Sequence, residues 1–282
     1  AKVETNTTPM AFFLPYLPVH HRWHGRWQAM AQTGVAGFVG QWRFYGMNGS
    51  PPEEMQYHAT WNPDRTADDL LAAVARRDFG LTESAAGRAV AGWRKLSEAW
   101  DSFPWSAMMC GEREGYMRGP FHLGPAHPMI LDVQSDYRLD PRKFRAIRPD
   151  LFELGEPENL DELLRQARPR YVSELMLVLP FGVTRCLDLL GRCRAAWSAG
   201  LAELRAAFGA EPTPRARMEL DIVETIDIHL ATTEHVIRFY DARDRLWRER
   251  GGIERFRRGM AELAGFVRDE IANARRALGI LE

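Results

Sequence analysis

Polar and aromatic side chains follow two predicted strands near the start of the chain. Glu4 lies at the end of a short β-like run, and Trp42, Arg43 and Tyr45 close a second run, VAGFVGQWRF. An aromatic ring packs well against the C–H face of a sugar, and the forked donors of arginine suit hydroxyls or a carboxylate. These residue types favour a carbohydrate-binding site where the two strands end. In the alternative interpretation, Glu4 is a surface residue near the terminus and Trp42 only fills the end of a barrel.

Three histidines lie within five residues of one another, at His20, His21 and His24. Two imidazoles four residues apart can share one face of a helix, as they do in zinc helices, but the glutamate of an HExxH pattern is missing. We therefore predict no metal ion and no cofactor. We expect His20 or His21 to line the sugar pocket, while the other histidines are solvated or cap the helix.

A loop rich in glycine and proline, YMRGPFHLGPAHP, carries Tyr116, Arg118, His122 and His127. Long ordered loops are often functional. One interpretation makes Tyr116 and Arg118 part of a lid that contacts substrate at the barrel mouth. The other, which we favour, makes this loop a bridge between the barrel and the helical half of the chain.

The elements that must position these residues follow the order strand, loop, helix, strand. A β-like run ends at Glu4, an amphipathic stretch reaches Gly34, and the second β-like run follows at once. This order is the repeating unit of a (β/α)8 barrel, whose chemistry sits at the C-terminal ends of its strands. We predict loops at 46–54 and 61–66, where proline, glycine and asparagine gather.

From Thr66 onward the pattern becomes helical. Thr66 can cap a helix that ends at Gly80, and a second helix with a buried apolar stripe follows it. After the long loop region, further helices are expected at 183–208, from 214 to about 250, and in the last segment. Long helices joined by short turns predict an antiparallel three-helix bundle.

The predicted fold class is therefore mainly α with a small α/β part. The last two strand–helix units of a (β/α)8 barrel occupy residues 1–62, helices and a long loop region occupy 63–158, and an antiparallel helical bundle occupies 159–282.

Composition and charge narrow the possible functions. The 282 residues carry a net charge of −1, whereas nucleic-acid binders usually show a basic bias, so we expect no nucleic-acid partner. The sequence has no apolar run long enough to span a membrane and no secretory signal, which favours a cytoplasmic over a secreted location. Three cysteines give no disulfide framework, and Cys186 and Cys193 are expected to pack on one buried helix face.

The stretches VETNTT, PYLPVHHRWHGRWQAMAQTGVAGFVGQWRFYG and ATWNPDRTADDLLAAVARRDFG, in this order, resemble the terminal part of bacterial glycoside-hydrolase-like proteins with a (β/α)8 barrel. The closing EIANARRALGIL resembles their last helix, so the resemblance covers nearly the whole chain. It implies that 1–4 is the seventh strand and 35–44 the eighth, with six strands upstream or on another chain. It also implies that Glu4 is the nucleophile or an electrostatic stabiliser, with its partner acid on a strand that this sequence lacks.

Two functions from different classes follow. The first is a carbohydrate-active, glycoside-hydrolase-like protein that hydrolyses or binds a glycoside at the barrel rim and is incomplete without the upstream strands. The second is a non-catalytic helical module for interaction or self-association, in which an exposed apolar seam drives pairing, for instance as a homodimer. A metal-dependent hydrolase built on the His20 cluster is a third, remote alternative.

Overall fold

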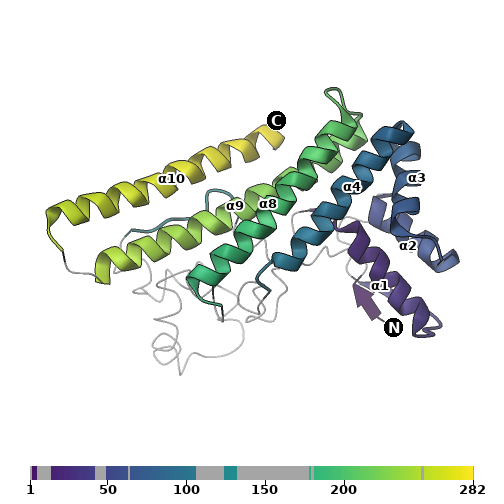
Figure 1. The fold of residues 1–282 in the computed structure, drawn as a ribbon, viewed down its shortest axis with the longest axis horizontal. Coiled ribbons are helices and arrows are strands. Elements are labelled where there is room, and N and C mark those ends of the chain that lie inside the picture. Colours follow the sequence, from purple (N-terminus) through teal and green to yellow (C-terminus); the bar gives the residue numbers. More distant parts are fainter. Residues whose placement is uncertain are drawn as a thin grey trace, which may run out of the picture.

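The computed structural model describes residues 2–4, 14–41, 49–62, 64–105, 124–131, 178, 181–248 and 251–281. Figure 1 shows the long helices side by side in one layer, with the shorter helices gathered at one end of it. The short helices are α1 (His20–Gln32), α2 (Pro51–Trp61) and α3 (Ala67–Phe79). The layer consists of α4 (Glu83–Ala99, continued by the 3-10 helix η1, Trp100–Ser102), α8 (Val183–Phe208), α9 (Pro214–Arg248) and α10 (Ile253–Leu281).

Local signals set the ends of α3 as the sequence predicted. The Thr66 side chain accepts a hydrogen bond from the backbone N–H of Asp69, at 3.1 Å. Gly80 ends the helix in the left-handed conformation, with φ of 68°, which costs glycine little because it has no Cβ. The predicted helix at 183–208 is likewise confirmed as α8.

The layer is held together by close contacts between antiparallel neighbours. Gly92 on α4 faces Gly200 on α8, and a Cβ at Gly200 would lie 2.6 Å from Cδ2 of Leu96. The two glycines therefore let α4 and α8 approach more closely than larger residues would allow. Next to this glycine contact, the rings of Trp100 and Trp197 lie 5.4 Å apart.

One buried apolar cluster runs through the described helices, with members from Leu14 to Leu263. Cys186 and Cys193 are both fully buried in it, as predicted from their spacing on α8. Burial raises the pKa of Cys186 to about 11 and that of Cys193 to about 12, so both thiols stay protonated at neutral pH. These cysteines therefore contribute packing.

The prediction of a (β/α)8 barrel, and with it of a glycoside-hydrolase barrel, was wrong. The described residues are almost entirely helical, and their only strands are β1 (Lys2–Glu4) and β2 (Val39–Gln41), which form a single parallel pair of three residues each. In a barrel, helices cover a closed sheet. Here α1, α3, α4, α8 and α9 pack on one another instead, so the helices supply their own core.

The region at 46–54 was predicted as a loop, but α2 begins within it, at Pro51. Ser50 and Glu53 form a capping box, in which the Glu53 side chain accepts from the backbone N–H of Ser50 at 3.1 Å. Pro51 then occupies the first turn of α2, where its missing N–H costs nothing. The two prolines that indicated a loop therefore mark a helix start.

Candidate functional site

Most of the residues predicted to bind sugar lie outside the described part of the chain. Trp42, Arg43, Tyr45, Tyr116 and Arg118 all belong to this group. Their role in a carbohydrate site stays a prediction.

Glu4 is described through its backbone, and the register of the strand pair places it opposite Gln41. The two runs that were expected to be neighbouring barrel strands therefore pair in parallel, without the barrel. A catalytic role of Glu4 stays a prediction.

His20 lies in a buried polar cluster around the carboxylate of Glu219 on α9. The Tyr16 hydroxyl donates to Oε2 of Glu219, the Trp93 indole N–H donates to Oε1 at 2.7 Å, and Nε2 of His20 lies 3.4 Å from Oε1. All four side chains are fully buried. Burial, reinforced by the Glu219 charge, raises the pKa of Tyr16 well above 10, so its hydroxyl remains a donor. The cluster therefore connects three helices, α1, α4 and α9, with the segment that precedes α1.

His21 pairs with Asp68 at the first turn of α3. Its Nε2 lies 2.9 Å from Oδ1 of Asp68, which also pairs with Arg94 of α4. Burial lowers the pKa of His21 despite this bond, which favours the neutral imidazole. His24 also turns to α3, with Nε2 2.8 Å from the carbonyl oxygen of Arg65. Through these described contacts, His20 joins α1 to α9, and His21 and His24 join α1 to α3 and the residue before its cap.

A second buried carboxylate, Glu270 on α10, anchors the extended segment 124–131. It accepts from the backbone N–H of Ala126 at 2.9 Å and from the Thr232 hydroxyl at 2.8 Å, and Nδ1 of His235 lies 2.7 Å away. Burial by itself raises the pKa of Glu270, but the hydrogen bonds from these three groups outweigh burial and leave the pKa below its ordinary value. Sequence reasoning missed Glu270, because its partners lie 35 to 144 positions away.

The depressed pKa of Glu270 predicts a pH dependence of stability. Because the folded pKa lies below that of the unfolded chain, the ionised carboxylate stabilises the fold above about pH 4, and this contribution is lost as pH falls through the folded value. Glu270→Gln should therefore lower the free energy of unfolding by about 1–3 kcal/mol at pH 7 and by less in acid. Urea unfolding of the wild-type and Glu270→Gln proteins between pH 7 and pH 3 measures this change. A difference in unfolding free energy that stays constant with pH would contradict the prediction.

A groove of about 400 Å³ lies beside this anchor, between segment 124–131 and α10. We call it the α10 groove. Its walls are mostly apolar, and Arg275, His127 and Glu270 supply its polar groups. The remaining lining residues are Ala126, Pro128, Met129, Val267, Ile271, Ala274 and Leu278.

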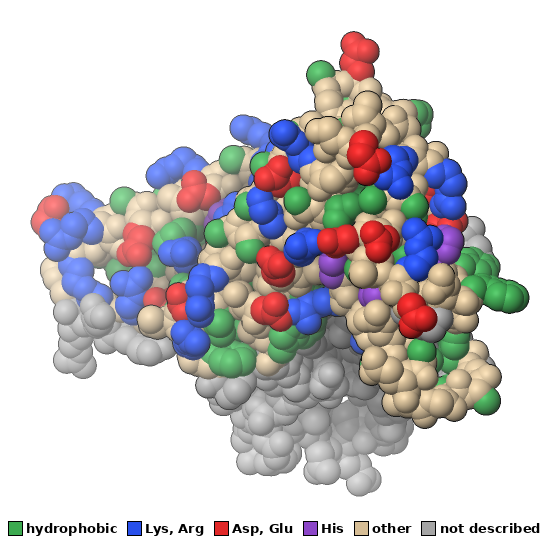
Figure 2. Space-filling view, turned by 45° about the vertical axis from the view of Figure 1, so that its right-hand side comes forward, with side chains coloured by type: hydrophobic (Ala, Val, Ile, Leu, Met, Phe, Trp, Pro, Cys, Tyr) green, Lys and Arg blue, Asp and Glu red, His purple; other side chains and the backbone are tan. Residues whose placement is uncertain are grey.

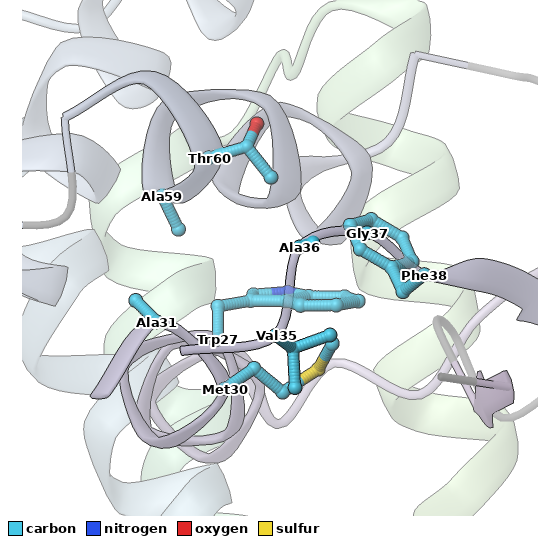
Figure 3. Close-up of a pocket in the computed structure, with 9 residues that line it drawn as sticks. All are labelled: Trp27, Met30, Ala31, Val35, Ala36, Gly37, Phe38, Ala59 and Thr60. Carbon is cyan, nitrogen blue, oxygen red and sulfur yellow. The ribbon is translucent and has the colours of Figure 1, made fainter. Parts of the chain in front are cut away.

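A separate cleft of about 350 Å³, the Trp27 cleft, lies between α1, α2 and residues 35–38. Figure 3 shows the Trp27 ring at its centre, with Met30 and Val35 on one side and the α2 residues Ala59 and Thr60 on the other. Nothing in the sequence pattern singles out this tryptophan, because Trp23 on the same helix is equally buried.

Across the described ranges, no group of three or more His, Cys, Asp or Glu side chains could hold a metal ion. No helix among the described residues combines the length and the apolar character that crossing a bilayer requires. Figure 2 shows basic and acidic side chains interspersed over the visible face, without one large field of a single sign.

A comparison of the chain with protein families, with curated proteins and with solved structures found no match.

Proposed function

We propose that this chain is a non-catalytic helical interaction module, and that its last helix, α10, docks an amphipathic helix whose apolar stripe is flanked by Asp and Glu. The observation that carries this proposal is a second apolar stripe on α10, beside the face that packs on α9. We call it the α10 stripe. Its members recur every three or four residues: Ile253, Phe256, Met260, Ala264, Val267, Ile271, Ala274 and Leu278.

The α10 stripe lies beside the face that α9 covers, and two of its members, Met260 and Val267, are half-buried against the core. Leu263, Glu270 and Asn273 are buried against α9. At about 100° per residue, the stripe lies roughly 90° around the helix from these three residues. Ile271 remains 47% exposed and Leu278 58% exposed. In Figure 1 α10 forms the edge of the layer, so among the described helices only α9 lies beside it.

The spacing of the α10 stripe is that of a helix seam. From Met260 to Leu278 the apolar positions alternate steps of four and three residues, which is the heptad pattern of helices that pack at a shallow angle. The α10 groove follows the C-terminal half of the seam. Pro128 and Met129 line this groove together with Val267 and Leu278. A helical partner would therefore bury apolar side chains on α10 and against segment 124–131.

Charge indicates which partner fits. Arg268 and Arg275 lie along the solvent side of the α10 stripe, as does Arg257, which pairs with Glu254 at 2.7 Å. Arg268 and Arg275 make no ion pair within the described part of the chain. Two copies of α10 that paired through this stripe would bring arginines toward arginines, which costs free energy. An acid-flanked helix would satisfy them instead.

The test uses the full chain and a synthetic helical peptide of three heptads, with Leu at a and d and Glu at e and g. We expect saturable binding by fluorescence polarisation, and weaker binding of a peptide with Lys at e and g. Each lost apolar contact is worth about 1.5–3 kcal/mol. The double substitution Ile271→Asp and Leu278→Asp should therefore weaken binding at least tenfold. Met218→Asp, at an exposed apolar position of α9, is the matched control.

Two results would overturn the proposal. The first is an acidic peptide that binds no better than the basic one or is insensitive to the double substitution. The second is a dimer, seen by sedimentation, that the double substitution dissociates, because the occupant of the stripe would then be a second copy of this chain.

A further inference from the structure

We infer that Tyr240, which does not line the α10 groove, positions one wall of that groove, so that the partner helix binds only while segment 124–131 is held in place. We call this segment the strap. Figure 1 shows it as a teal coil beside α9 and α10. The inference rests on the proposed function, and it adds a residue that controls docking from outside the docking surface.

Side chains of α9 hold the strap through its backbone. The Tyr240 hydroxyl donates to the carbonyl oxygen of Pro128 at 3.1 Å and accepts from the backbone N–H of Ile130 at 3.3 Å. Arg243, about one turn further along α9, donates to the carbonyl oxygen of Ile130 at 3.0 Å. Both side chains are buried, so they are fixed before the strap meets them. Two neighbouring residues of α9 thus hold three backbone groups of the strap.

The beginning of the strap is fixed at Ala126. Its backbone N–H donates to the buried Glu270 carboxylate at 2.9 Å, and its φ is 62°, which residues with a Cβ rarely adopt. Such a conformation persists only where the surrounding contacts impose it. Between these points, Met129 packs half-buried against the core. The position of the strap therefore depends on a few specific contacts.

These contacts matter for docking because the strap supplies one wall of the α10 groove, through Ala126, His127, Pro128 and Met129. An extended segment keeps one conformation only if its contacts outweigh the conformational entropy of the free chain. If only a fraction of the molecules has the wall in place, the apparent Kd of a partner rises in inverse proportion to that fraction. Loss of the Tyr240 hydroxyl should therefore weaken docking.

The coupling between strap and partner must act in both directions. A partner that binds only when the strap is in place also stabilises the strap, by the same factor. Hydrogen-bonded backbone amides exchange with solvent when their contacts open. Binding of the partner should therefore slow hydrogen exchange at the N–H groups of Ala126 and Ile130, which bond to Glu270 and Tyr240.

The experiment uses the full chain and the acidic three-heptad peptide that tests the proposed function. Tyr240→Phe keeps the ring that lies 4.5 Å from the Arg243 guanidinium and removes only the hydroxyl. Since each net hydrogen bond is worth about fivefold, exchange at Ile130 should accelerate about tenfold or more, and the peptide Kd should rise about threefold or more. Trp197→Phe, which loses an indole hydrogen bond away from the strap, is the matched control and should change neither quantity.

Ala126→Pro is a stronger disruption of the same wall. Proline has no N–H to donate to Glu270, and its ring fixes φ at about −65°, so residue 126 could not adopt its present conformation. Ala126 is exposed, so the substitution leaves the core intact. We expect the peptide to bind this protein about tenfold more weakly or worse, because the wall is then missing in most molecules.

The outcomes separate this inference from the proposed function. Equal binding of the peptide by the wild-type, Tyr240→Phe and Ala126→Pro proteins would overturn the inference alone. Tighter binding by the Ala126→Pro protein would overturn it as well, because the strap would then compete with the partner. Exchange at Ala126 and Ile130 that the bound peptide does not slow has the same consequence. A wild-type chain that fails to bind the peptide would overturn the proposed function and this inference together.

Discussion

Replacing Glu219 with alanine should destabilise the fold by about 3–5 kcal/mol. The Tyr16 hydroxyl and the Trp93 indole both donate to this carboxylate, and His20 lies beside it. All of these groups are fully buried, so water cannot replace the lost acceptor. Each buried donor left without an acceptor costs about 1–3 kcal/mol, and breaking a buried polar cluster by removing its charged member costs about 3–5 kcal/mol. Urea unfolding at pH 7 measures the change.

Two further variants distinguish the stability that the buried cluster contributes from the general effect of replacing a glutamate. Glu219→Gln keeps one acceptor oxygen and should lose about 1–3 kcal/mol, because its amide group cannot accept the second donor. Glu211→Ala, at an exposed position in the turn between α8 and α9, should change stability by about 0.5 kcal/mol or less. If Glu219→Ala unfolds at the same urea concentration as Glu211→Ala, the cluster does not hold the short helices to the layer as described.

Replacing Trp197 with alanine should cost about 3–5 kcal/mol, the usual range for truncating a buried tryptophan. Trp197 is fully buried on α8, where its ring lies against Trp100 of η1 and its indole N–H donates to the carbonyl oxygen of Val223 on α9. One side chain thus joins three neighbouring elements of the layer. The measurement is again the free energy of unfolding in urea, with near-UV circular dichroism to follow tryptophan packing.

Two control variants separate the parts of the Trp197 contribution to stability. Trp197→Phe retains most of the ring contact but removes the indole hydrogen bond to the Val223 carbonyl, so about 1–3 kcal/mol should be lost. Trp61→Ala removes a tryptophan that is 85% exposed and should change stability by about 0.5 kcal/mol or less. Equal losses for Trp197→Ala and Trp61→Ala would show that the centre of the layer lies elsewhere.

Helix boundaries could be predicted from the sequence because their signals are local. The cap of α3 involves Thr66 and Asp69, three residues apart, and Gly80 ends that helix by its own conformational freedom. The bounds of α8 and the buried position of Cys186 and Cys193 follow from a helical period within one segment. Such interactions are completed within one or two helical turns, so the sequence alone determined them.

Tertiary contacts decided the rest. A β-like run forms a long strand only if neighbouring strands pair with it, and within the described residues β1 and β2 pair only with each other, over three residues. The sequence drew attention to His20 and His21, but their partners Glu219 and Asp68 lie 199 and 47 positions away. The exposed stripe of α10 likewise exists only because of what the described helices leave uncovered. Propensity and capping thus set the helices, while packing between distant segments set the fold class and the candidate docking surface.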